Sequence, residues 1–320
     1  MVADDRKQMA RPFLKWAGGK GQLLPQLDML LPEGLSRRKE FTYIEPFVGG
    51  GAMLFHMLQK FPNIRRVVIN DINPHLVTAY GVVKDHADEL IERLKDVEQR
   101  YLALETEEAR KSFFLNARET FNEQELDEID RTKYLIFLNR TCFNGLYRVN
   151  GRGKFNVPFG RYSRPVICNE ETLRADSAIL NSVEMTILAG DFAQTLDHVG
   201  QGYTLFYLDP PYRPLSATSS FTSYAKEDFN DDEQIRLRDF CVRLNESLGI
   251  GWMLSNADCS AKNPEDTFFE DEYACFYISR VSASRAINAN AARRGKLTEL
   301  VISNYAPRGY GMCVAENKSS

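Results

Sequence analysis

The chain has 320 residues, of which 43% are hydrophobic and 26% are charged. This is typical of soluble globular proteins with one large α/β domain and a smaller one. The formal net charge of −4 suits a nucleic-acid enzyme only if its positive charges are gathered locally. No stretch approaches the ~18 apolar residues of a membrane span and the polar start lacks a signal-peptide core, so we expect a cytoplasmic protein without a membrane partner. The six cysteines and four histidines lack the spacing of zinc ligands, and we expect free thiols and no metal.

The first predicted elements alternate between strand and helix. Residues 41–45 indicate a short strand, residues 49–51 a glycine turn, and residues 52–58 a helix with apolar side chains at helical spacing. Residues 66–71 predict a second buried strand that ends in an acid, and residues 74–83 predict the helix after it. This alternation predicts a doubly wound α/β fold with a mostly parallel sheet.

The glycine turn is a candidate cofactor site, because glycines let a ligand approach the backbone closely. Its spacing does not match the Gly-x-Gly-x-x-Gly pattern of dinucleotide folds, and residues 18–21 do not complete a phosphate-binding loop. Asp71, at the end of the next strand, is suited to accept hydrogen bonds from a ribose diol. A cofactor with a ribose but little phosphate fits best, and S-adenosyl-L-methionine is the obvious candidate. A plain structural turn is the alternative.

An inserted, mostly helical module is predicted between the two halves of the sheet. Residues 85–100 and 103–122 are charged and amphipathic, which predicts helices, whereas residues 133–139 fit either a buried helix or a strand. A loop region rich in Gly, Asn and Arg follows. The predicted boundaries are residues 1–80 with 165–306 for the cofactor-binding and catalytic domain, 81–164 for the inserted module, and 307–320 for a tail that we expect to be disordered.

Positive charge is concentrated in two segments that contain no acidic residue. Residues 131–169 contain the basic residues Arg131, Lys133, Arg140, Arg148, Arg152, Lys154, Arg161 and Arg164. Residues 273–298 contain Arg280, Arg285, Arg293, Arg294 and Lys296. Such segments predict a phosphate-binding surface, with an ordinary solvated face as the alternative.

Further strands are predicted at residues 184–188, 203–208, 250–255, 274–279 and 297–304. The second of them leads directly into Asp209-Pro210-Pro211-Tyr212, which is suited to methylating an exocyclic amino group with a delocalised lone pair. Asp209 and the Pro210 carbonyl hold the amino hydrogens, while the prolines fix φ. Tyr212 offers a face on which a flipped base stacks. An ordinary strand end is the alternative.

Six sequence blocks occur together in one order. They are FLKWAGGK (13–20), EPFVGGG (45–51), NDIN (70–73), NGLYR (144–148), FNVPFGRY (155–162) and DPPY (209–212). Together they resemble the Dam-type DNA adenine N6-methyltransferases, alpha-class amino methyltransferases of the GATC type. The resemblance departs at Gly50, where the family commonly has Ala. It implies an S-adenosylmethionine-dependent methyltransferase fold with an inserted, mostly helical DNA-recognition domain, and methyl transfer to a flipped adenine.

The resemblance also implies the cofactor site. The methionine end of S-adenosyl-L-methionine would lie near Trp16 and Lys20, its ribose on Asp71, and its adenine between Asp191 and Phe192. The expected cofactor-binding residues are Trp16, Gly18, Lys20, Glu45, Phe47, Gly49, Asp71, Asp191, Phe192 and Asp209. The expected catalytic residues are Asp209, Pro210, Pro211 and Tyr212.

The expected partner is double-stranded DNA, bound by a monomer or by two copies on one palindromic site. Arg148 would read guanine in the major groove. Leu146 and Pro158 would contact a thymine methyl, and Phe143 with Asn144 would fill the gap left by the flipped base. The full set of expected DNA-binding residues is Lys15, Arg140, Phe143, Asn144, Leu146, Arg148, Lys154, Pro158, Arg161 and Tyr162.

Three alternatives differ in substrate or class. An amino methyltransferase acting on cytosine N4 or on RNA adenine would use the same loop. A catalytically inactive DNA-binding regulator would keep the scaffold without the chemistry, although all residues of the catalytic loop are present. A nicotinamide-dependent enzyme is disfavoured by the glycine spacing.

Overall fold

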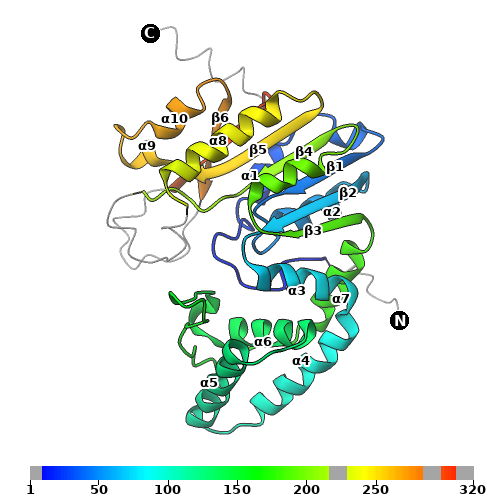
Figure 1. The fold of residues 1–320 in the computed structure, drawn as a ribbon, viewed down its shortest axis with the longest axis vertical. Helices are drawn as coiled ribbons and strands as arrows, with labels where there is room; N and C mark the ends of the chain where they lie inside the picture. The colour runs from blue at the N-terminus through cyan, green and yellow to red at the C-terminus, as the bar shows by residue number, and fades with distance from the viewer. Residues whose placement is uncertain (1–8, 216–228, 284–296, 308–320) are drawn as a thin grey trace, which may run out of the picture. The chain divides into compact units, whose positions relative to one another are not determined.

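A computed structural model of the chain describes residues 9–215, 229–283 and 297–307. Its strands are β1 (Phe41–Glu45), β2 (Ile64–Asp71), β3 (Glu184–Ala189), β4 (Thr204–Leu208), β5 (Ile250–Ala257), β6 (Tyr277–Ala283) and β7 (Leu297–Ser303) (Figure 1). They form one sheet in the order β3-β2-β1-β4-β5-β7-β6. The predicted α/β fold with a mostly parallel sheet is confirmed.

The helices confirm the predicted alternation of strand and helix. They are α1 (Leu24–Met29), α2 (Ala52–Lys60), α3 (Pro74–Asp85), α4 (Ala87–Leu102), α5 (Glu107–Glu123), α6 (Glu128–Thr141), α7 (Glu170–Leu180), α8 (Asp231–Asn245), α9 (Cys259–Lys262) and α10 (Phe268–Glu272). Short 3-10 helices are η1 (Leu35–Arg37), η2 (Phe143–Gly145) and η3 (Phe192–His198). Within the described part of the chain, no helix combines the length and the apolar character needed to cross a membrane.

The described residues form two compact units. The first contains the chain up to Gly19, Val48–Pro62 and Ile69–Asp191, and the second contains Lys20–Phe47, Asn63–Val68 and the chain from Phe192 on. The first unit therefore carries the glycine turn and all of residues 81–164. The second carries the Asp-Pro-Pro-Tyr segment at 209–212.

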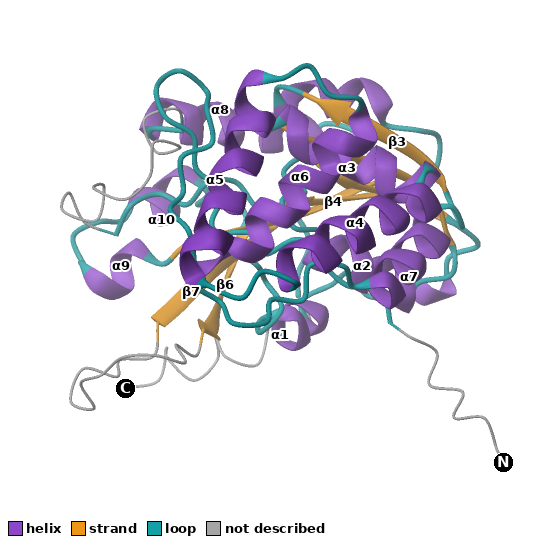
Figure 2. Cartoon of the chain, turned by 90° about the horizontal axis from the view of Figure 1, so that it is seen from below, coloured by secondary structure: helices purple, strands orange, loops and turns teal. Residues whose placement is uncertain are grey.

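The second unit is built on the parallel strands β1, β4 and β5. Their side chains are buried along the whole length of each strand, as expected where both faces of a parallel sheet are covered. Phe206 of β4 pairs with Ile44 of β1 and with Trp252 of β5, so the three strands end at the same edge. β7 is antiparallel to both of its neighbours, β5 and β6, and runs beside β6 in Figure 2.

The first unit is dominated by helices, and α6 lies at their centre. It packs against α3, α4 and α5 (Figure 1). Residues 133–139, which fitted either a helix or a strand, lie inside this helix. Because α6 is covered on several sides, its apolar residues fall all around it and hide the helical period. Asp127 marks its start by accepting the Asp130 N–H.

One predicted strand begins later than expected. The strand predicted at 274–279 begins at Tyr277, because the preceding residues close α10: the Tyr273 N–H donates to the Phe269 carbonyl and the Phe276 N–H donates to the Tyr273 carbonyl. The helices α7 and α8 were not predicted. The predictions for Arg285, Arg293, Arg294, Lys296, Cys313 and residues 308–320 lie outside the described residues.

Candidate active site

The loop predicted to be catalytic, residues 209–212, leaves the edge of the sheet at which the parallel strands of the second unit end. Asp209 directly follows β4, Glu45 is the last residue of β1, and Asn256 is next to last in β5. Parallel strands bring their carboxyl ends together, which explains why polar residues from distant parts of the sequence meet here. The loop itself is Asp209-Pro210-Pro211-Tyr212.

Asp209 is paired with a buried lysine. Lys20 Nζ lies 2.9 Å from Asp209 Oδ1, and Lys20 is 6% exposed. Burial raises the pKa of Asp209 to about 6, while the charge of Lys20 and its hydrogen bond limit the rise. Above about pH 6 the carboxylate is therefore charged but poorly solvated. A hydrogen-bond donor that reaches it is bound more strongly than by a carboxylate in water.

Glu45 is a second buried carboxyl, 2% exposed. Tyr43 OH donates to its Oε2 at 2.9 Å. Burial holds the pKa of Glu45 well above its usual range, and the nearby Asp209 adds to the effect, whereas Tyr43 and Lys20 oppose it. A buried carboxyl in this state fits a ligand that brings a positive charge.

Tyr212 is fixed at its hydroxyl end. Its OH donates to Glu299 Oε2 of β7 at 2.7 Å. Lys20 Nζ lies 4.5 Å from the centroid of the Tyr212 ring, within the range of a cation–π contact. One lysine thus binds both the carboxylate and the aromatic ring of the loop, and the ring is held in one orientation.

An aromatic cluster in the second unit contains two of the predicted cofactor residues. The rings of Phe47 and Phe192 lie 5.2 Å apart, and Phe240 meets Phe192 edge-on at 5.4 Å. The Arg236 guanidinium covers the Phe192 ring at 4.2 Å. Phe192 is buried, whereas the side chain of Asp191, at the end of the first unit, is exposed.

In the first unit, Asp71 closes the glycine turn. Its two carboxylate oxygens accept the backbone N–H groups of Gly49, at 3.1 Å, and Asn73, at 2.9 Å. Burial raises the pKa of Asp71, and these two bonds oppose the rise. Gly51 has φ +74°, and a Cβ there would lie 2.4 Å from the Tyr80 hydroxyl oxygen. Only glycine fits, and each carboxylate oxygen of Asp71 keeps a lone pair for a further donor.

Trp16 packs next to this turn. A Cβ on Gly49 or Gly50 would come within 3.2 Å of the Trp16 side chain. The other side of the indole stacks on Tyr147, with ring centroids 5.2 Å apart. Gly18, two residues further on, has φ +80°. Trp16 of the N-terminal segment thus contacts both the glycine turn and Tyr147 of the NGLYR block.

The residues predicted to face DNA are organised by a buried amide. Asn139 of α6 accepts the Lys15 N–H at 2.9 Å and donates to the carbonyls of Lys15 and Gly145, each at 2.8 Å. Asn144 is held with φ +56°, and its N–H donates to the Tyr162 hydroxyl at 3.1 Å. Backbone groups that lie far apart in the sequence are therefore fixed around one side chain.

Apolar side chains are exposed on this part of the first unit. Phe143 is 53% and Leu146 42% exposed, and Pro158, whose carbonyl accepts the Phe143 N–H at 2.8 Å, is exposed as well. Lys15 Nζ lies 5.3 Å from the ring centroid of Tyr162. Exposed apolar residues beside a cation on rigid backbone are typical of a binding surface.

Arg148 is held in one direction. Its Nε donates to Asn156 Oδ1 at 2.7 Å, and its Nη2 to the Asn156 carbonyl at 3.3 Å. The other predicted cations have different partners. Arg140 donates to the Phe13 carbonyl at 2.7 Å, while Lys154 pairs with Glu123 and Arg161 with Glu107.

Several residues of the site have no motif of their own. Tyr43, Glu299 and Asn139 are missing from the predicted set, as is Tyr147, whose only signal is its place beside Arg148 in the NGLYR block. A metal centre has no counterpart in the described ranges, where no group of three or more His, Cys, Asp or Glu side chains is placed to hold an ion.

Comparison with known proteins identifies the family. A family model described as D12 class N6 adenine-specific DNA methyltransferase matches residues 16–287. The Type II methyltransferase M.MjaIII of Methanocaldococcus jannaschii is 47% identical over 92% of this chain and 99% of its own length. The Type II methyltransferase M1.LlaDCHI of Lactococcus lactis subsp. cremoris is 38% identical over 92% of this chain and 95% of its own. The DNA adenine methylase of Vibrio cholerae is 33% identical over 91% of this chain and 95% of its own length. The resemblance inferred from the sequence blocks is confirmed: the chain is an enzyme and belongs to the D12 class N6 adenine-specific DNA methyltransferase family.

Proposed function

We propose that this enzyme methylates N6 of an adenine that is flipped out of double-stranded DNA, within the sequence GATC. The observation that carries the proposal is the catalytic loop. A poorly solvated Asp209 carboxylate and a Tyr212 ring fixed by Glu299 stand together at the carboxyl edge of a parallel sheet. The relatives named as DNA adenine methylases support the choice of adenine.

The proposed chemistry needs orientation more than a strong base. Asp209 and the Pro210 carbonyl accept the two N–H bonds of N6 and hold the nitrogen in line with the donor. S-adenosyl-L-methionine supplies a methyl group bound to a positively charged sulfur. N6 forms a bond to the methyl carbon as the carbon–sulfur bond breaks, and the nitrogen then releases a proton to Asp209 or to water. A carboxylate has about four lone-pair sites, so Asp209 can accept from N6 while it stays paired with Lys20.

The proposed cofactor contacts follow from the chemistry of the residues. The buried carboxyl of Glu45 suits the ammonium group of the donor, and the free lone pairs of Asp71 suit a ribose diol. We assign the remaining contacts to Trp16, Gly18, Lys20, Phe47, Gly49, Asp191 and Phe192.

For DNA, we propose residues 81–164 as the recognition module. Arg148, preset by Asn156, reads guanine through a bidentate pair. The exposed Phe143 enters the gap left by the flipped base, while Leu146 and Pro158 contact a thymine methyl. Arg140, Lys154, Arg161 and Tyr162 take phosphate contacts and Lys15 an outer base pair, which requires that Lys154 and Arg161 exchange an acidic partner for phosphate.

The test is methylation of a plasmid with radiolabelled S-adenosyl-L-methionine, followed by digestion to nucleosides. We expect N6-methyladenine as the labelled product, and resistance of the plasmid to a GATC-cutting endonuclease that adenine methylation blocks. Label in N4-methylcytosine would contradict the proposed substrate. Label in adenine with undiminished cutting at GATC would contradict the proposed sequence alone.

A further inference from the structure

Two buried amide side chains tie the catalytic loop to the rest of the second unit. Gln234 of α8 donates from Nε2 to the Pro211 carbonyl at 3.0 Å, and its Oε1 accepts from Asn256 Nδ2 at 3.1 Å. Asn256 of β5 accepts the Arg213 backbone N–H at Oδ1, 3.1 Å away. The hydrogen bonds therefore run from Pro211 through both amides to Arg213 and enclose Tyr212. We call this arrangement the amide bridge.

Burial makes the amide bridge directional. Gln234 is 1% and Asn256 0% exposed, so an amide group that loses its partner there has no water to replace it. Each amide has one end that donates and one that accepts, and turning either side chain over would oppose two like groups. The Pro211 ring also fixes φ and removes the N–H, which leaves the carbonyl as the backbone group by which this residue is held.

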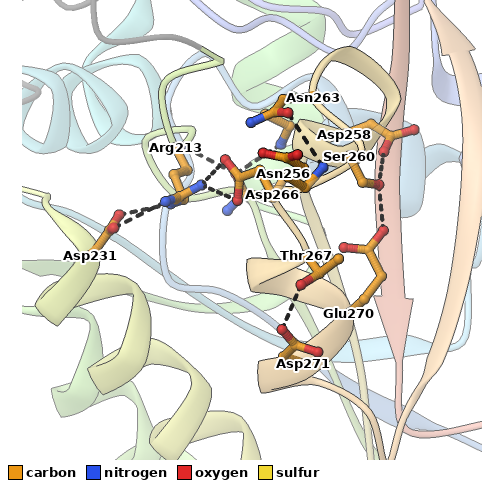
Figure 3. Close-up of polar contacts among 12 residues, drawn as sticks. Arg213, Asp231, Asn256, Asp258, Ser260, Asn263, Asp266, Thr267, Glu270 and Asp271 are labelled. Atoms are coloured by element: carbon orange, nitrogen blue, oxygen red, sulfur yellow. Dashed lines mark hydrogen bonds and ion pairs between the residues drawn. The ribbon is translucent and has the colours of Figure 1, made fainter.

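The residue after the loop is anchored through its side chain as well. Arg213 donates from Nε to Asp231 at 2.8 Å and from Nη1 to both carboxylate oxygens of Asp266, at 2.8 and 2.6 Å (Figure 3). Its guanidinium also covers the Phe268 ring at 4.5 Å. Asp231 begins α8, the helix that carries Gln234. Helix α8 therefore contacts both Pro211 of the loop and Arg213, which follows the loop.

We propose that Gln234 and Asn256 are positioning residues for methyl transfer, acting through the backbone of the catalytic loop. The inference rests on the proposed function, because it takes Asp209 and the Pro210 carbonyl as the groups that hold N6. These two groups lie on the same short segment as Pro211. Misplacement of a reacting group by about 1 Å costs on the order of 10²-fold in rate, so a small rotation at Pro211 is sufficient to slow the reaction.

The sharpest test changes one group. In Gln234→Glu the Nε2 donor becomes a carboxyl oxygen that opposes the Pro211 carbonyl once the carboxyl is ionised, while the acceptor for Asn256 is kept, so the rate is measured at high pH. Asn304→Asp is the control near the other end of β5, at a half-buried amide whose Nδ2 also donates to Asn245 Oδ1 at 3.1 Å. Asn304 Oδ1 accepts the Trp252 N–H at 2.9 Å and its Nδ2 donates to the Ile250 carbonyl at 2.9 Å. Both substitutions therefore set a carboxylate against a backbone carbonyl in the same unit.

The expected result is a separation of rate from binding. For Gln234→Glu we expect the single-turnover rate of methyl transfer to fall about 10²-fold, with the Kd values for duplex DNA and S-adenosyl-L-methionine within about threefold of wild type. For Asn304→Asp we expect lower thermal stability but a rate close to wild type. Equal losses of rate in the two variants, in step with their stability, would overturn the proposal, and so would an unchanged rate in Gln234→Glu.

A second variant covers the case in which Gln234→Glu does not fold. Gln234→Ala leaves the carbonyl of the exposed Pro211 to water and removes the acceptor of the buried Asn256 Nδ2, and we expect about a tenfold loss of rate, between wild type and Gln234→Glu. A wild-type rate in this variant would count equally against the amide bridge. Wild-type enzyme and Asp209→Ala, assayed alongside, separate the two hypotheses. If wild type is active and Asp209→Ala is not, the proposed function stands whatever the Gln234 variants do.

Discussion

The proposed catalytic loop of the second unit and the loops of the first unit that we propose face DNA differ in what their surroundings fix. Near Asp209, which is itself half-buried, the side chains of Lys20 and Glu45 are buried, and the environment changes the pKa of Asp209. Around Arg148 and Phe143 the important side chains are exposed, and direction is what the structure fixes, through Asn156 and Asn139. The comparison teaches that burial prepares a group for chemistry, whereas a rigid backbone beneath an exposed group prepares it for recognition.

The largest effect is expected from removing the carboxylate of Asp209. Asp209→Ala deletes the carboxylate that holds N6, and we expect the single-turnover rate to fall about 10³-fold or more. Binding of S-adenosyl-L-methionine, followed by calorimetry, should persist. Methyl transfer at more than a tenth of the wild-type rate would show that the loop is not the catalytic one. Asp239→Ala, at an exposed ion pair of α8, is a control for loss of a carboxylate.

The next largest effect is expected from removing the exposed side chain of Arg148, which we propose contacts guanine. Arg148→Ala should lower kcat/KM on GATC about 10- to 100-fold, because a bidentate contact to guanine contributes ~1–3 kcal/mol of discrimination. On sites with another base in place of that guanine, kcat/KM should fall less. The ratio of kcat/KM between GATC and such sites should therefore be smaller in the variant than in wild type. The exposed Arg152→Ala should instead weaken binding to all sequences alike, as a phosphate contact does. Equal loss on every sequence in Arg148→Ala would assign that arginine to phosphate as well.

A smaller effect follows from the pKa of Asp209. Since this pKa is raised to about 6, we expect the rate at pH 5 to be about a tenth of that at pH 8. The effect of pH on stability has the opposite sign. Because the pKa of Asp209 is higher in the folded state than its ordinary value of 3.8, binding of the proton stabilises the folded state. This stabilisation is fully present below pH 3.8 and is lost as the pH rises through 6. Pre-steady-state rates with denaturant titrations across pH 4.5–8 measure both. A rate independent of pH over this range would contradict the role of Asp209.

The smallest expected effect comes from the partner of Tyr212. Glu299→Gln keeps an acceptor for the hydroxyl but removes its charge, so we expect the rate to fall only about two- to fivefold. Because Glu299 also raises the pKa of Asp209, the acidic limb of the pH profile should move to lower pH in this variant. A shift to higher pH would show that Glu299 does not act on Asp209 through its charge.

Sequence reasoning predicted the parts that are carried by short contiguous patterns. The strands β1, β4 and β5, the glycine turn and the position of residues 209–212 directly after β4 all follow from local periodicity or from residue chemistry. For the central helix α6 the sequence fits a helix or a strand, because burial on several sides removes the periodic signal. The strand prediction is wrong for residues 274–276, because a turn that closes α10 precedes the strand.

The supporting residues could not be predicted in the same way. Gln234 and Asn256 are ordinary amides in sequence, and they are informative only when α8 and β5 bring them together behind Pro211. Asn139 likewise acquires its role from contacts with Lys15, which is far away in the chain. Such residues depend on long-range packing, which no short pattern encodes.

The antiparallel strand β7 has a consequence for the order in which the enzyme becomes competent. It is inserted between β5 and β6, both of which leave the ribosome earlier, and it carries Glu299. A nascent chain can therefore complete the Asp209 loop while the phenol of Tyr212 still lacks its acceptor. Docking of β7, the last strand in the described part of the chain, supplies this acceptor, so we expect full activity only after synthesis has passed beyond it.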